Sequence, residues 1–312
     1  MQHASPLAGV ELGGTKCVCT LGTGPDDIRE QAVIPTTRPG ATLGAIERLL
    51  LAWRTRHGPI AALGIASFGP VDLRAQSPTY GFIRATAKAG WTDTDVLGRL
   101  ARALAVPVEF NTDVNGAALA EQRWGAAREL DDFAYVTVGT GIGAGLIVGG
   151  RPVRGFGHTE LGHLRIARMP GDAWPGSCPY HGDCLEGLAS GTAIAARTAV
   201  AADQLPDDHE VWESVAFALT QLLHALVVTT APRRIFLGGG VLAGQPHLLP
   251  RVRSQLTKSL NGYIRPCEAD PGLVRYIVAP GLGVLAGPLG AIALAAQAAL
   301  AAEAGRALST SK

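Results

Sequence analysis

The stretch VELGGTKCVCTL, residues 10–21, consists of an apolar run, a glycine turn and a second apolar run. Residues 135–150, YVTVGTGIGAGLIVGG, repeat this order with different residues. Short apolar runs that flank glycine turns are typical of buried strands joined in a hairpin. Two units that each open on such a hairpin indicate a duplicated α/β architecture with a cleft between two domains.

Helices and strands are expected to alternate outside these hairpins. The predicted helices cover residues 43–56, 93–105, 191–202, 211–229 and 247–260, and the predicted strands cover residues 60–66, 108–110, 234–237 and 274–278. Thr92 is the expected N-cap of the helix at 93–105. The first domain is expected to span residues 1–113 and the second residues 114–283, with helices in residues 284–312 returning to the first.

A motif with metal-ligand spacing lies in a glycine- and proline-rich loop. It reads Cys178-x-x-His181-x-x-Cys184, with His163 upstream of it. Two thiols and two imidazoles suit tetrahedral Zn²⁺, and four protein ligands leave no position for a reactive water. We therefore expect a structural zinc. His158 is an alternative fourth ligand, but Gly162 lets the backbone bend toward the metal at His163.

Two carboxylates bracket these ligands in the sequence. Glu160 lies just before His163, and Glu186 lies just after Cys184. Either both acids are simply solvated, or the metal fixes them so that they hold a polar ligand. The spacing favours the second interpretation.

Three glycine turns follow apolar strands: Gly13-Gly14-Thr15, Gly139-Thr140-Gly141-Ile142-Gly143 and Gly238-Gly239-Gly240. Glycine permits the backbone angles and close approach that let amide groups surround phosphate oxygens. Each turn alone could be a tight hairpin, but three together favour a bound nucleotide. None matches the P-loop or dinucleotide-binding patterns.

Asp113 ends a predicted buried strand between Asn111 and Asn115. It is either a general base that accepts a hydroxyl proton or an Asx cap of the next helix. Lys88 and Trp91 lie earlier in the chain, in the segment KAGW, which is a candidate sugar-binding loop. Trp91 is either a ring that stacks on sugar or a packing residue.

Composition excludes several classes of protein. The chain has 312 residues, 40 glycines, 17% charged residues and a net charge of +1, which gives no basic field for nucleic acid. The N-terminus lacks a signal-peptide pattern, and five cysteines fit a reducing compartment, so we expect a cytoplasmic protein.

Cys17 and Cys19 are expected to pack in a strand, whereas the sequence gives no indication of a role for Cys267. The uncharged residues 276–302 are expected to form a buried helix rather than a membrane span.

These motifs together resemble the ROK (repressor, open reading frame, kinase) family of sugar kinases. The run TGIGAGLIVGGRPVRGFGHTELGH carries the resemblance, and NTDVN, the cysteine-containing loop and LGGG follow the family's order. The resemblance implies an actin-like, hexokinase-type (ribonuclease H-like) fold, ATP and Mg²⁺ as cofactors, a structural Zn²⁺ and a homodimer. The family's repressors carry an N-terminal helix-turn-helix domain. Because the first predicted strand begins by about Leu7 and the net charge is near zero, we expect no DNA-binding role here.

The resemblance also implies roles for individual residues. Asp113 would be the base that removes the proton from the acceptor hydroxyl, and Glu11 would contact Mg²⁺ indirectly. Sugar hydroxyls would be held by Asn111, Glu160, His163 and Glu186, with Lys88 and Trp91 on the sugar-side loop. The phosphates would be held by Gly13, Gly14, Thr15, Lys16, Thr140, Gly141 and Gly143, and Gly239 and Gly240 would lie near the adenosine.

Within the family, ELGGTK and the Cys-x-x-His-x-x-Cys loop resemble the bacterial fructokinases. This implies transfer from ATP to the 6-hydroxyl of D-fructose. Another hexose (glucose, mannose or N-acetylmannosamine) and a non-catalytic sugar-binding regulator are the alternatives. The chain departs from the family at Ala87, Thr159 and Thr192, where we expect proline, and we expect looser loops there.

Overall fold

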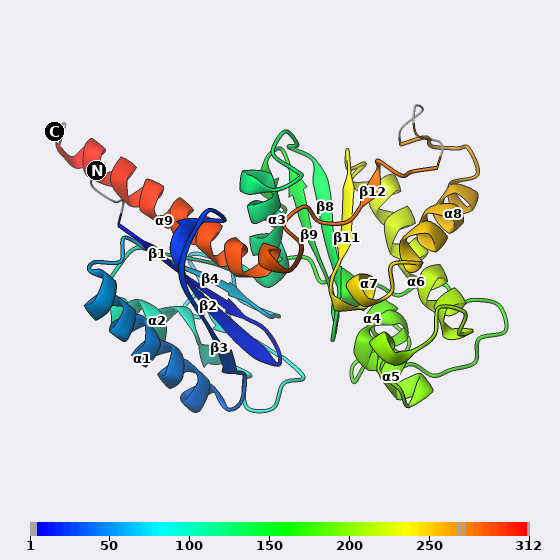
Figure 1. The fold of residues 1–312 in the computed structure, drawn as a ribbon, viewed down its shortest axis with the longest axis horizontal. Coiled ribbons are helices and arrows are strands. Elements are labelled where there is room, and N and C mark those ends of the chain that lie inside the picture. Colours follow the sequence, from blue (N-terminus) through cyan, green and yellow to red (C-terminus); the bar gives the residue numbers. More distant parts are fainter. Residues whose placement is uncertain (1–4, 267–269, 271, 311–312) are drawn as a thin grey trace. The chain divides into compact units, whose positions relative to one another are not determined.

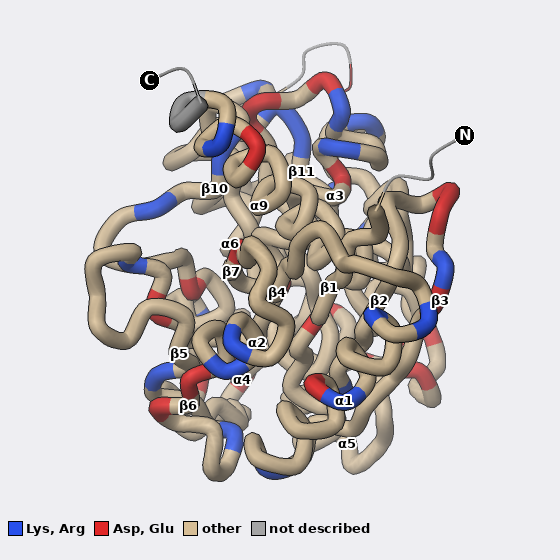
Figure 2. Tube along the Cα trace, turned by 90° about the vertical axis from the view of Figure 1, so that its left-hand side faces the viewer, with Lys and Arg blue, Asp and Glu red and all other residues tan. Residues whose placement is uncertain are grey.

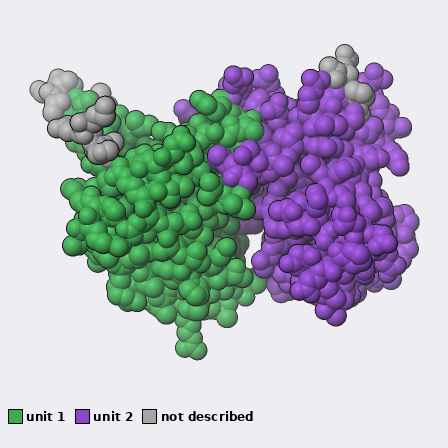
Figure 3. Space-filling view, viewed as in Figure 1, with its two compact units in different colours: residues 1–128, 154–158, 284–312 green, residues 129–153, 159–283 purple. Residues whose placement is uncertain are grey.

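The computed structural model describes residues 5–266, 270 and 272–310. The chain forms two compact units, shown in Figure 3. The first contains residues 1–128, 154–158 and 284–312, and the second contains residues 129–153 and 159–283. The first unit therefore continues past the predicted boundary at residue 113, because the helix that begins there packs on the C-terminal helix. Cys267 lies outside the described residues.

A five-stranded mixed sheet forms the centre of the first unit, in the order β3-β2-β1-β4-β7 (Figure 1). Its strands are β1 (Leu7–Leu12), β2 (Lys16–Gly24), β3 (Asp27–Pro35), β4 (Leu63–Ser67) and β7 (Val108–Thr112). β1, β2 and β3 pair antiparallel, and β4 and β7 extend the sheet parallel to β1. The short strands β5 (Phe82–Ile83) and β6 (Thr94–Asp95) form a separate ribbon.

Helices cover both faces of this sheet. Helices α1 (Pro39–His57) and α2 (Leu97–Leu104) pack their apolar side chains against Ala8, Val10 and Leu12. Helices α3 (Asp113–Trp124) and α9 (Ala286–Thr310) cover the opposite face. A Cβ on Gly64 would lie 1.9 Å from the carbonyl oxygen of Ala291, so glycine is required where α9 crosses β4.

A second five-stranded sheet, β10-β9-β8-β11-β12, forms the centre of the second unit. Its strands are β8 (Phe133–Val138), β9 (Ile142–Val148), β10 (Arg151–Pro152), β11 (Ile235–Gly238) and β12 (Ile277–Val278). Again the first three strands pair antiparallel and the last two extend the sheet in parallel. The two sheets share one topology, so the duplication predicted from the two hairpins is confirmed.

The helices of the second unit are mostly short, except for one long apolar helix. They are α4 (Leu185–Ala189), α5 (Gly191–Thr198), α6 (Val211–Thr229), α7 (Gly240–Gly244) and α8 (Leu248–Leu260), with 3-10 turns at Leu161–His163 and Ala202–Gln204. A further 3-10 turn, Gly283–Leu285, lies where the chain passes from the second unit to the first. Leu219, Leu222 and Leu223 of α6 are fully buried in the core.

Every predicted helix and strand is present, but several of their ends differ from the prediction. Helix α1 begins at Pro39 rather than residue 43, β4 begins at Leu63 rather than residue 60, α5 ends at Thr198 rather than residue 202, and β12 covers only Ile277–Val278. Helix α2 begins at Leu97 and not at residue 93, because Asp93 takes a left-handed conformation (φ 57°) and β6 follows. Thr92 is therefore not the N-cap. The Asp95 carboxylate instead accepts the Gly98 N–H at 2.7 Å, which satisfies one of the free amides of the first turn.

Among the residues that the structure describes, two segments are long and apolar enough to cross a membrane: α6 and residues 283–307. Their apolar windows are 67% and 61% buried, as expected of core helices in a folded unit. Charged residues of both signs are interspersed along the chain in Figure 2 rather than gathered by sign. Cys17 and Cys19 are fully buried in the first core, which confirms their packing role.

Candidate metal centre and phosphate-binding turns

Four side chains of the second unit meet as the CxxHxxC motif predicts: His163, Cys178, His181 and Cys184. The Nδ1 atoms of the two histidines are 3.3 Å apart, and the Sγ–Nδ1 distances are 3.6 to 3.7 Å. Tetrahedral Zn²⁺ with bonds of about 2.0 Å to nitrogen and about 2.3 Å to sulfur needs about 3.3 and about 3.6 Å. The donor set and its spacing therefore fit this ion.

His163, rather than His158, is the fourth member of the cluster. The Nε2 atom of His158 accepts the Val71 N–H at 2.9 Å, within the first unit. His163 ends a 3-10 turn, and a bridge between Arg165 and Cys184 brings the two ends of the loop together. The cluster is thus assembled by backbone pairing on both sides of the proline-rich segment.

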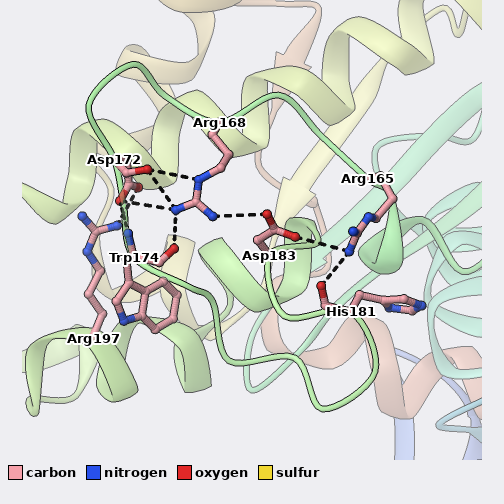
Figure 4. Close-up of polar contacts among 7 residues, drawn as sticks. All are labelled: Arg165, Arg168, Asp172, Trp174, His181, Asp183 and Arg197. Carbon is pink, nitrogen blue, oxygen red and sulfur yellow. Dashed lines mark hydrogen bonds and ion pairs between the residues drawn. The ribbon is translucent and has the colours of Figure 1, made fainter.

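An ion-pair network supports this loop from outside the cluster (Figure 4). The Arg168 guanidinium donates to the carbonyl oxygens of Asp172 and Trp174 and to the Asp183 carboxylate. Arg165 pairs with the same Asp183 and donates to the His181 carbonyl at 2.6 Å. Irregular backbone without helix or sheet is held here by guanidinium donors.

Glu186 contacts the second glycine turn. Its Oε2 accepts the backbone N–H of Ile142 at 2.8 Å, and a Cβ on Gly141 would lie 2.5 Å from the same oxygen. Burial, and then the charge of Glu186, raise the pKa of Glu160 to about 7. Glu160 keeps more than a third of its surface accessible, so solvent moderates this shift.

The glycine turn at Gly139–Gly143 is closed and then held by α5. Within it, the Gly139 N–H donates to the Gly141 carbonyl at 2.9 Å. From α5, the Gly191 N–H donates to the Gly139 carbonyl at 2.7 Å, and the Thr192 hydroxyl donates to the Thr140 carbonyl at 2.8 Å. Thr140 itself is exposed, so the tip of the turn is accessible to a ligand.

The third glycine turn follows β11. Gly239 has φ 96°, and a Cβ there would lie 2.4 Å from the Val138 carbonyl oxygen. Only glycine meets both conditions. Gly240 is exposed and begins α7. The turn therefore packs against the end of β8, beside the start of the second turn.

In the first unit, the turn at Gly13–Lys16 is a tight hairpin closed by Gly13 N–H donation to the Lys16 carbonyl at 3.1 Å. The Thr36 hydroxyl donates to the Gly13 carbonyl at 2.7 Å and holds the turn from β3's end. Gly14, Thr15 and Lys16 are exposed. Because these residues are accessible, the turn could be reached by a phosphate group, and its phosphate-binding role stays a prediction.

Glu11 lies on β1 below that turn, and its carboxylate faces α9. Burial, then the charge of Asp113, raise its pKa to about 7, while the charge of Lys16 opposes the shift. A Cβ on Gly287 would lie 2.0 Å from its Oε1. A carboxyl that titrates near neutrality beside a second acid is a feature of functional sites.

Asp113 is the first residue of α3, and it is not the cap of that helix. Thr112 is the cap, since its hydroxyl oxygen accepts the Asn115 N–H at 3.2 Å. Asn111 is buried, and its Oδ1 accepts the Asn115 side-chain N–H at 2.8 Å. Asn115 thus fixes the Asn111 amide, a support that the sequence analysis missed.

Trp91 is not a ring on which a sugar can stack, so that prediction is wrong. It is fully buried, its indole N–H donates to the Thr37 carbonyl at 2.7 Å, and its ring meets Phe68 edge-on. Lys88 stays partly exposed and lines an open pocket of about 700 Å³ together with Arg38 and Gly90. Trp91 therefore anchors the loop that presents Lys88.

Both threonines that stand where proline was expected form hydrogen bonds to backbone carbonyls. The Thr159 hydroxyl donates to the Ala144 carbonyl at 3.0 Å, and the Thr192 hydroxyl holds the second glycine turn. Each of these side chains therefore ties its loop to a neighbouring backbone carbonyl. The sequence signal that could have found these contacts is weak, because threonine hydroxyls bond to backbone in many loops.

The whole chain is similar to known proteins of one family. The model of the ROK family matches residues 7–298. A fructokinase of Pediococcus pentosaceus is 42% identical over 294 residues, covering 94% of this chain and 98% of its own. A fructokinase of Zymomonas mobilis is 42% identical over 290 residues, covering 92% and 95%.

Solved structures agree on the fold. The crystal structure of a ROK hexokinase from Thermus thermophilus has a TM-score of 0.75 at 28% identity and covers 94% of this chain and 98% of its own. A ROK glucokinase from Streptomyces griseus, solved with glucose and AMPPNP, has a TM-score of 0.74 at 24% identity over 94% and 100%. The expected hexokinase-type α/β fold is confirmed by these likenesses.

Proposed function

Since the chain belongs to the ROK family, we propose that it is an ATP-dependent kinase that phosphorylates D-fructose to fructose 6-phosphate. The observation that carries this proposal is the identity of about two residues in five with fructokinases over nearly the whole of both chains. The metal cluster and the glycine turns agree with the proposal.

We assign the chemistry to Asp113. Its carboxylate would accept the proton of the 6-hydroxyl as that oxygen forms a bond to the γ-phosphorus of ATP. The bond from the γ-phosphorus to the β,γ-bridging oxygen would break, and ADP would leave with that oxygen. The Thr112 cap and the Asn111–Asn115 pair support this assignment, because they fix the backbone on both sides of Asp113. We expect Asn111 to orient the same substrate.

The remaining assignments follow the resemblance. Glu160, His163 and Glu186 would hold sugar hydroxyls, with Lys88 at the rim. Zn²⁺ would bind His163, Cys178, His181 and Cys184 and supply structural support. Gly13 to Lys16 and Thr140 to Gly143 would hold phosphates, Gly239 and Gly240 would lie near the adenosine, and Glu11 would contact Mg²⁺ through water. We further expect a cytoplasmic homodimer.

The first experiment measures ADP release with ATP and Mg²⁺ across fructose, glucose, mannose and N-acetylmannosamine. A clear preference for fructose supports the proposal. A preference for another hexose keeps the kinase but replaces its substrate. Sugar binding with no turnover for any of the four would point to a regulator instead.

The second experiment tests the base. Asp113→Asn should lower kcat by about 10²- to 10⁴-fold, the usual contribution of a general base. Fructose affinity should stay within a few-fold, because the amide keeps the shape of the side chain. Near-normal kcat in this variant would remove Asp113 from the mechanism.

A further inference from the structure

Ile142, the first residue of β9, has both backbone polar groups against the metal-binding segment. Its N–H donates to Glu186 at 2.8 Å, and its carbonyl oxygen lies so close to Gly162 that a Cβ there would be 2.0 Å away. Glu186 is two residues after Cys184, and Gly162 immediately precedes His163. The end of the glycine turn is thus held next to two ligands of the cluster.

The two ligands are also tied to each other through the backbone. The Leu185 N–H donates to the Leu164 carbonyl at 3.0 Å, one residue beyond Cys184 and His163 respectively. Cys184 is the N-cap residue of α4, whose second residue is Glu186. A shift of Cys184 or His163 therefore moves the two groups that hold Ile142.

The other end of the turn depends on different contacts. Gly191 and Thr192 hold the carbonyls of Gly139 and Thr140 from α5, and neither of them adjoins a ligand in the sequence. The turn is therefore held by two separable sets of hydrogen bonds. The hydrogen bond from Ile142 to Glu186 should depend on the metal cluster. The bonds from Gly191 and Thr192 should not, so a change at Thr192 is a matched control.

We infer that Glu186 is a positioning residue that couples the metal cluster to nucleotide binding at Gly139–Gly143. This inference rests on the proposed function, since it takes the turn as a phosphate site. It assigns Glu186 a task besides holding sugar: it fixes the peptide between Gly141 and Ile142, so that the neighbouring amides keep the orientation that phosphate oxygens need. An occupied cluster then favours bound nucleotide.

The sign of the effect on nucleotide binding distinguishes a positioning role of Glu186 from that of a nearby negative charge. A carboxylate beside a phosphate site repels the ligand, so removing it should tighten nucleotide binding if charge alone matters. If Glu186 instead positions the turn, removing it should weaken binding. The two readings predict opposite signs for Glu186→Ala.

The test measures the Kd of ADP with Mg²⁺ by calorimetry, without sugar, in metal-loaded protein and after chelator treatment and dialysis. In wild type we expect metal removal to weaken ADP about 10-fold, the order expected for one hydrogen bond to a charged group. Glu186→Ala should bind ADP about 10-fold more weakly when loaded, with little further change without metal. Thr192→Val should also bind more weakly but keep the full metal effect.

Glu186→Gln keeps the inference testable if the metal-free protein unfolds. Its amide oxygen still accepts the Ile142 N–H, so loaded Glu186→Gln should bind ADP within about 3-fold of wild type while Glu186→Ala does not. Tighter ADP binding by Glu186→Ala, or an equal metal effect in Glu186→Ala and wild type, would overturn the inference. Absence of ADP binding in loaded wild type would overturn the proposed function itself.

Discussion

Substitution of Glu11 by glutamine should change the pH dependence of stability in a calculable way. The pKa of Glu11 is raised from 4.5 to about 7 by burial and by the charge of Asp113, against the charge of Lys16. Between these values the folded chain keeps the proton and the unfolded chain loses it. The free energy of unfolding therefore falls as pH rises through this window and levels off above it.

The size of the effect follows from the shift. The span from 4.5 to about 7, at about 1.4 kcal/mol for each pH unit, corresponds to about 3 kcal/mol. Glutamine has no proton to lose. The stability of Glu11→Gln relative to wild type should therefore increase by about 3 kcal/mol between pH 4.5 and 7, and stay constant above.

Urea unfolding without nucleotide or Mg²⁺, at intervals from pH 4.5 to 8, measures this difference. Titratable groups that do not interact with Glu11 are present in both proteins, so their contributions cancel in the difference. Glu303→Gln, an exposed position on α9, is the control and should show a flat difference. A difference of less than about 1 kcal/mol for Glu11→Gln, or one that grows as pH falls, would refute the reasoning.

Three further substitutions test the packing and the metal cluster. Gly64→Ala should lower the free energy of unfolding, measured by urea titration, by about 3 kcal/mol or more, because its Cβ would lie 1.9 Å from the Ala291 carbonyl oxygen. Gly14→Ala is the control and should change this free energy little, because the added Cβ would point into open space. Cys184→Ser should lose bound zinc in elemental analysis and lower the thermal midpoint; a wild type without zinc would contradict this. Trp91→Phe should reduce stability by about 1 kcal/mol through the lost hydrogen bond but leave fructose affinity within about 3-fold, and a larger loss of affinity would restore a direct sugar contact.

Local pattern predicted much of the fold. Glycine turns between apolar runs located both hairpins, and the CxxHxxC spacing identified ligands that the structure brings together. Sequence separation is short in each case, so local pattern carries the information. The predicted start of helix α2 was wrong because Asp93 takes a left-handed conformation, which the local pattern did not indicate.

Contacts between distant segments were not predictable from one sequence. Packing is the default role for a single tryptophan, but a stacking role for Trp91 could be rejected only from its contacts with Thr37 and Phe68. Likewise, nothing in the spacing of Glu186 indicates that its carboxylate accepts the N–H of Ile142, which lies 44 positions earlier in strand β9. Such roles depend on which backbone groups the fold leaves to be satisfied.

Helix α9 has a consequence for how the protein is made. The face of β1 and β4 that receives it contains Gly9 and Gly64, and no residue before position 284 belongs to that helix. The ribosome must add roughly 155 residues after Arg128 before this cover emerges, roughly 10 to 30 s at about 5–20 residues per second. During that time this face of the first sheet has only α3 packed against it, so the nascent chain should bind chaperones until its last helix is released.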